Sequence, residues 1–168
     1  MKTRLSCAGC GAVVHDDDPA PFRCPARRLS DGNNDDIDHV LRREFIDPPA
    51  SAAGFAGREE NPFVRYRERL RSHELFLASG RADADYVALV DRLDTAVARV
   101  WGHGFAATPF SPSAVLGALV KDETGNVAGS HKARHLFGVL LHLESMNLPR
   151  ATPLAIASCG NAALAAAV

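Results

Sequence analysis

Residues 121–135, KDETGNVAGSHKARH, decide the predicted fold together with a second loop at residues 158–162, SCGNA. Each is a short glycine-bearing segment that leads into an apolar run, as a loop between a strand and a helix does. Short apolar runs at residues 115–120 and 153–157 precede the two loops and suit buried strands. Strand, loop and helix in alternation predict an α/β fold with the start of a parallel sheet.

Helices are expected both before and after the first loop. Asn61-Pro62 supplies a cap and a first-turn proline, and Gly102 supplies a helix end. Ser130 is expected to cap the helix that follows the loop. Apolar spacing and these signals predict helices around residues 37–45 and over residues 61–80, 83–102 and 130–145.

Three segments are expected along the chain. Residues 1–30 resemble a small cysteine knuckle, residues 31–104 form a linker and helical segment, and residues 105–168 form the beginning of the α/β domain. The composition, with 46% apolar and 23% charged residues, is that of a globular protein. A net charge of −1 gives no electrostatic case for nucleic acid or an anionic membrane. Four cysteines without a signal peptide indicate reduced thiols and a cytoplasmic location.

Lys132 is the candidate reactive residue of the first loop. In open parallel sheets, ligands bind outside the carboxyl ends of the strands, where this lysine would begin a helix. Its amine, when unprotonated, could condense with an aldehyde cofactor. Spacing alone favours an exposed lysine in a polar loop, by roughly two to one.

The two loops resemble those of a known enzyme family. Gly129-Ser130-His131-Lys132 follows Lys121-Asp122-Glu123, Thr108-Pro109-Phe110 lies upstream, and Ser158-Cys159-Gly160-Asn161 lies downstream. This arrangement is similar to the lysine loop and the asparagine loop of the tryptophan-synthase-β-like enzymes, which bind pyridoxal phosphate and have fold type II. The second loop resembles the threonine synthase and serine/threonine dehydratase branch.

The resemblance implies roles for individual residues. Lys132 would hold pyridoxal phosphate as an imine and remove the substrate's α-proton. His131 would lie beside the cofactor, with a structural role equally open, and Asn161 would hydrogen-bond the cofactor's ring hydroxyl. The substrate carboxylate would lie against the second loop, at Ser158, Cys159, Gly160 and Ala162. Cys159 replaces the family's usual hydroxyl residue, which puts one carboxylate contact in doubt.

The resemblance also implies an activity. The enzyme would be a lyase or synthase that performs β-elimination or β/γ-replacement on an amino acid, as a homodimer. Family members continue into a later phosphate-binding loop, so we expect an amino-terminal fragment that is inactive alone. The alternative is a non-catalytic zinc-ribbon-type binding or adaptor module with an α/β remnant.

The amino-terminal cysteines leave metal binding open. Cys7-x-x-Cys10 followed by glycine is half of a zinc knuckle, and Cys24 offers a third thiolate. Either His15 or His39 could be the fourth ligand, although neither has a standard spacing. We expect a knuckle without metal, with a zinc site as the alternative.

Overall fold

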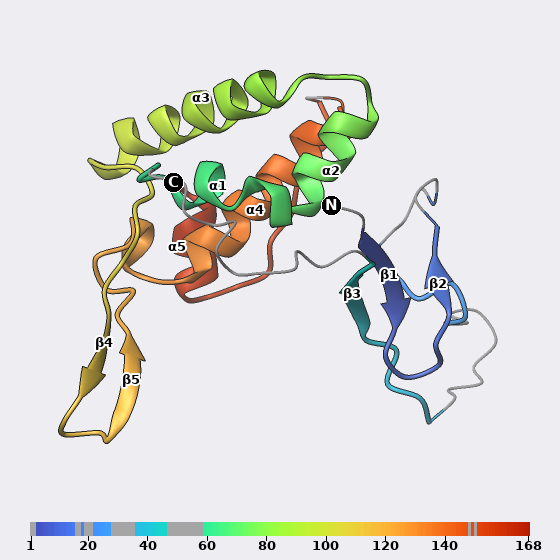
Figure 1. Ribbon diagram of the computed structural model, residues 1–168, viewed down its shortest axis with the longest axis horizontal. Helices are drawn as coiled ribbons and strands as arrows, with labels where there is room; N and C mark the ends of the chain where they lie inside the picture. Colours follow the sequence, from blue (N-terminus) through green and yellow to red (C-terminus); the bar gives the residue numbers. More distant parts are fainter. Residues whose placement is uncertain are drawn as a thin grey trace. The chain divides into compact units, whose positions relative to one another are not determined.

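A computed structural model of the chain describes residues 3–15, 18, 22–27, 36–46, 59–147, 149 and 151–168. The chain divides into two compact units, Met1–Ala52 and Ala53–Val168. Its fold is mixed α/β, as expected, and Figure 1 shows the elements of each unit. Both sheets in the described part are small and antiparallel.

The first unit contains a three-stranded sheet with the order β2-β1-β3. Its strands are β1 (Thr3–Cys7), β2 (Val13–Val14) and β3 (Leu41–Phe45). The helix expected around residues 37–45 is wrong, because residues 41–45 form the strand β3 and pair with β1, from Thr3 opposite Phe45 to Cys7 opposite Leu41. Part of the predicted linker segment therefore belongs to the sheet of the first unit.

The second unit consists of short and long helices with one hairpin (Figure 1). In chain order the elements are α1 (Pro62–Arg65), the 3-10 turn η2 (Arg67–Arg69), α2 (Arg71–Ala78), α3 (Asp83–Trp101), β4 (Phe110–Ser113), β5 (Ala118–Lys121), the 3-10 turn η3 (Val127–Gly129), α4 (Lys132–Ser145) and α5 (Asn161–Ala166). None of the described helices has the length and apolar character needed to cross a membrane.

The predicted helix ends are largely confirmed. The Asn61 side chain accepts a hydrogen bond of 2.9 Å from the amide of Phe63, as an N-cap does. Gly102 ends α3 in the left-handed conformation, with φ of 96°. A single helix over residues 61–80 is wrong, because the chain leaves the helical conformation at Tyr66 and is extended at Leu70.

The core of the second unit fixes helix α4. Phe63, Phe105 and Phe137 form an aromatic cluster with ring centroids 4.7–5.2 Å apart. Tyr86 of α3 and Leu141 of α4 are completely buried beside it. Because Phe137 and Leu141 are anchored in this way, the first turn of α4 has a defined position.

The two buried strands of the expected parallel sheet are not formed. Residues 115–117 lie in the turn of the β4–β5 hairpin, where Val115 is 94% exposed. The left-handed φ of 60° at Gly117 allows the chain to fold back there, so β5 pairs with β4 antiparallel. Residues 153–157 form no strand, and Leu154 and Ile156 are exposed.

Candidate functional site

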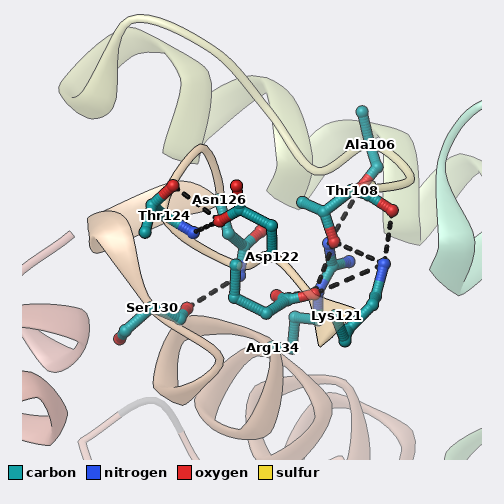
Figure 2. Close-up of polar contacts among 9 residues, drawn as sticks. Ala106, Thr108, Lys121, Asp122, Thr124, Asn126, Ser130 and Arg134 are labelled. Carbon is teal, nitrogen blue, oxygen red and sulfur yellow. Dashed lines mark hydrogen bonds and ion pairs between the residues drawn. The ribbon is translucent and has the colours of Figure 1, made fainter. Parts of the chain in front are cut away.

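A polar network around Glu123 joins three segments of the second unit. Figure 2 shows its partners Thr108, Lys121 and Arg134. One Glu123 oxygen lies 2.7 Å from Nε of Arg134 in α4, and the other accepts from the Thr108 hydroxyl. Arg134 also donates to the carbonyl of Ala106, at 2.8 Å. Lys121, at the end of β5, lies 3.6 Å from Glu123 and donates to both oxygens of Thr108. The network therefore ties the hairpin and its entry to the start of α4.

The charge of Glu123 is stabilised in this environment. Burial by itself raises the pKa of a carboxyl group, and Glu123 is partly buried. The hydrogen bonds from Thr108 and Arg134, with the positive charges of Arg134 and Lys121, outweigh burial and lower the pKa of Glu123 below its usual value. Glu123 is therefore an ionised anchor near neutral pH.

The loop between β5 and α4 is closed by its own polar side chains. Asp122 accepts hydrogen bonds from the amide and the hydroxyl of Thr124, at 2.9 and 2.6 Å. The buried side chain of Asn126 donates to the carbonyl of Ser130 at 2.8 Å (Figure 2). Its Oδ1 atom is buried and has no hydrogen-bond partner among the described residues. Asn126 was not among the site residues predicted from the sequence, although the sequence shows the turn Thr124-Gly125-Asn126 that could have indicated it.

Lys132 is the first residue of α4, which confirms the helix predicted after Ser130. The Lys132 amide donates to the Ser130 hydroxyl at 3.3 Å. The Lys132 side chain is half-buried, and within the described residues its amine makes no hydrogen bond or ion pair. His131, immediately before the helix, is exposed. The loop thus presents one lysine without a polar partner, whereas Lys121 is held by Thr108.

The second predicted loop lies at the start of α5. Ser158, Cys159 and Gly160 are exposed, and the amide of Gly160 donates to the Ser158 hydroxyl at 3.3 Å. The helix expected to follow this loop is confirmed, because α5 begins at Asn161. Helix α5 packs against both η3 and α4, so the elements that carry the two loops are neighbours.

An apolar groove of about 550 Å³ lies nearby, bounded by α3, α4, α5 and residues 154–156. It is lined by apolar side chains such as Leu93, Phe137 and Ile156. Neither Lys132 nor Asn161 contributes to its described lining. The groove therefore borders the lysine loop, through Val127 and Ala133, without including Lys132 itself.

The three cysteines singled out in the first unit converge with His39. The ligand-capable atoms of Cys7, Cys10, Cys24 and His39 all lie within 4.8 Å of one another. Cys10 Sγ is 3.5 Å from Cys24 Sγ, and Cys7 Sγ is 3.6 Å from His39 Nδ1. We call these four residues the cysteine cluster.

The cluster changes the acidity of two thiols: the pKa of Cys7 is lowered and that of Cys10 is raised. The pKa of Cys7 is lowered to about 6, chiefly because its sulfur accepts a hydrogen bond from the backbone amide of Cys10. Burial opposes this effect, and the contact with His39 adds to it. Cys159, the fourth cysteine, is exposed in the second unit.

Comparisons of the chain with protein-family models, with curated proteins and with solved structures found no match.

Proposed function

We propose that this chain carries the lysine loop and the asparagine loop of a pyridoxal-phosphate-dependent enzyme similar to threonine synthase and the serine/threonine dehydratases. The observation that carries the proposal is the polar network of Glu123. It joins Thr108, the Lys121–Glu123 segment and α4, which are the segments quoted for the resemblance. An amino-acid substrate, β-elimination or β/γ-replacement, a homodimer and a cytoplasmic location belong to the same proposal.

The choice of reactive lysine follows from hydrogen bonding. Lys121 donates to the carbonyl and the hydroxyl of Thr108, so its amine is occupied. Lys132 has no such partner among the described residues, and its half-buried position reduces its contact with water. An amine that acts as a nucleophile needs an available lone pair. We therefore assign the covalent attachment of the cofactor to Lys132.

The side chains of the two loops suit the chemical groups of pyridoxal phosphate and its substrate. Pyridoxal phosphate, when bound, supplies an electron sink for the charge left on the substrate's α-carbon. Lys132 would hold it and would then accept and return the α-proton at Nζ. Asn161 would bind its ring hydroxyl, and the exposed segment from Ser158 to Gly160 would bind the substrate carboxylate. Contact between α5 and both α4 and η3 supports this pairing.

The buried side of the loop also fits a positioning role. Asn126 closes the turn before Lys132 through the Ser130 carbonyl, and Arg134 fixes the first turn of α4 through Glu123. These contacts restrict the direction in which the Lys132 side chain leaves the helix. The proposal rests on the loops alone, because the described strands do not form the family's parallel sheet.

Covalent labelling tests this assignment. The sequence has three lysines, Lys2, Lys121 and Lys132. The chain would be mixed with a near-stoichiometric amount of pyridoxal phosphate, reduced with borohydride and mapped by mass spectrometry. We expect Lys132 to be labelled at least about tenfold more than Lys121, which corresponds to about 1.4 kcal/mol.

Two variants complete this experiment. Lys132→Arg should remove the dominant label, and Lys121→Arg should leave it in place. Equal labelling of the three lysines, or an unchanged label in Lys132→Arg, would overturn the assignment.

A further inference from the structure

The geometry points to a structural zinc site formed by Cys7, Cys10, Cys24 and His39. This inference concerns the first unit and is independent of pyridoxal phosphate. It also reverses the sequence-based preference for a metal-free knuckle and selects His39 over His15 as the fourth ligand.

The distances in the cysteine cluster agree with a tetrahedral site. Zinc binds cysteine sulfur at about 2.3 Å and histidine nitrogen at about 2.0–2.1 Å, so neighbouring ligand atoms lie about 3.6–3.8 Å apart. The separations of 3.5 Å between Cys10 and Cys24 and of 3.6 Å between Cys7 and His39 are close to this value. The widest separation, at most 4.8 Å, needs to contract by about 1 Å. Cys10 is exposed in a turn, where such a movement is easy.

The backbone brings His39 to the knuckle. The amide of Ala8 donates to the carbonyl of Val40 at 2.8 Å, which holds the two segments together. A Cβ atom at Gly9 would lie 2.4 Å from the carbonyl oxygen of Asp38, so only glycine permits this approach. Gly11 adopts a φ of 74° and completes the turn that directs Cys7 and Cys10 to one side.

The donor set selects the kind of metal. Three thiolates and one imidazole are soft and borderline ligands, which suit zinc and not the oxygen-preferring cations magnesium and calcium. Four protein ligands fill a tetrahedral site and leave no position for water or substrate. The site is therefore structural.

The first unit needs such a link because its core is very small. Among its described residues, the buried apolar side chains are those of Cys7, Val14 and Cys24. Two of these three are ligands, so the metal would occupy the centre of the core. Small domains with so few buried apolar residues usually require a metal or disulfides. The sulfurs of Cys10 and Cys24, at 3.5 Å, are not bonded to each other.

The test uses the full chain purified under reducing conditions. Elemental analysis should find one zinc per chain. After chelation, cobalt(II) should restore a tetrahedral spectrum with sulfur-to-cobalt charge-transfer bands of the intensity that three thiolates give. No bound zinc, or an octahedral cobalt spectrum, would overturn the proposal. A Cys10–Cys24 disulfide that persists under these reducing conditions would also overturn it.

Matched variants identify the ligands. Cys24→Ser and His39→Asn should each weaken zinc binding by more than the roughly 10- to 100-fold that loss of an outer partner costs. Cys159→Ser and His15→Asn, at the exposed residues outside the cluster, should bind as the unmodified chain does. His39→Cys should retain tight binding with a four-thiolate cobalt spectrum, which separates ligation from misfolding. Equal losses in the ligand and control variants would refute the assignment.

Discussion

Replacement of Gly9 by alanine should separate His39 from the other members of the cysteine cluster. The new Cβ atom would lie 2.4 Å from Asp38 O and 2.6 Å from Cγ2 of Ile37. Ordinary contacts begin near 3.4 Å, so the two segments must move apart by about 1 Å. Overpacking of this kind costs about 1–3 kcal/mol.

The expected loss can be expressed as metal affinity. Because a structural metal binds the folded unit and not the unfolded chain, strain in the folded unit weakens metal binding. A cost of about 1–3 kcal/mol corresponds to a decrease of about 5- to 150-fold in zinc affinity. Competition with a chromophoric chelator measures this affinity. Hydrogen exchange of the Ala8 amide, which donates to Val40, provides a second readout in the zinc-bound chain.

A second glycine provides the control. Gly138 lies inside α4, and no atom lies within 4 Å of a Cβ added there. Gly138→Ala should stabilise the helix by about 0.5–1 kcal/mol and leave zinc affinity unchanged. Equal zinc affinity and unchanged Ala8 exchange in Gly9→Ala would refute the close approach of the two segments.

Three further substitutions test the packing and electrostatics of the second unit by urea unfolding, followed through its single tryptophan. Leu141→Ala should cost about 2–5 kcal/mol, because the side chain is completely buried; a cost below 1 kcal/mol would contradict this core. Asp83 binds Arg67 through two hydrogen bonds, which lower its pKa to about 2, so its contribution is present above about pH 4 and lost as the pH falls toward 2. The half-exposed carboxylate limits this contribution to about 1 kcal/mol, and Asp83→Asn should abolish the corresponding pH dependence. Glu123→Gln should cost about 1–2 kcal/mol by leaving partly buried Arg134 without its ion pair, and an unchanged midpoint would show that the network is not stabilising.

Helices were predicted well where capping or terminating residues lie next to the helix ends. The Asn61-Pro62 start, the Gly102 stop and the helix after Ser130 each depend on residues within one turn of the boundary. The break at Tyr66 was missed, because the apolar spacing continues across it. Local capping signals therefore predict where a helix begins or ends better than they predict whether it continues without a break.

The strands and the fourth ligand depend on partners far away in the sequence. Residues 41–45 form a strand because they pair with residues 3–7, an interaction that their own periodicity does not reveal. The same pairing sets Cys7 opposite Leu41 and so brings His39, two residues before Leu41, to the thiolates. Spacing along the chain gave no basis for choosing between His15 and His39, whereas the sheet register does.

The apolar runs failed as signals of buried strands for a different reason. Residues 115–120 and 153–157 were assigned to buried strands because apolar side chains usually mark burial. Residues 118–120 do belong to β5, but this strand is largely exposed and pairs antiparallel with β4. In this structure Val115 and Leu154 are exposed, so these apolar side chains are present without another element packed against them. An apolar run specifies a strand only when another element is available to pack on it.

The absence of the predicted buried strands affects the asparagine loop more than the lysine loop. The position of Lys132 depends on Glu123, Arg134 and the buried residues of α4, and none of these contacts requires a parallel sheet. The asparagine loop follows residues 153–157 directly, so its exposed position at Ser158 reflects the unformed strand. Selective labelling at Lys132 is therefore the more discriminating test of the proposed function. A substitution of Asn161 tests a loop whose surroundings still lack the strand on which its predicted role depends.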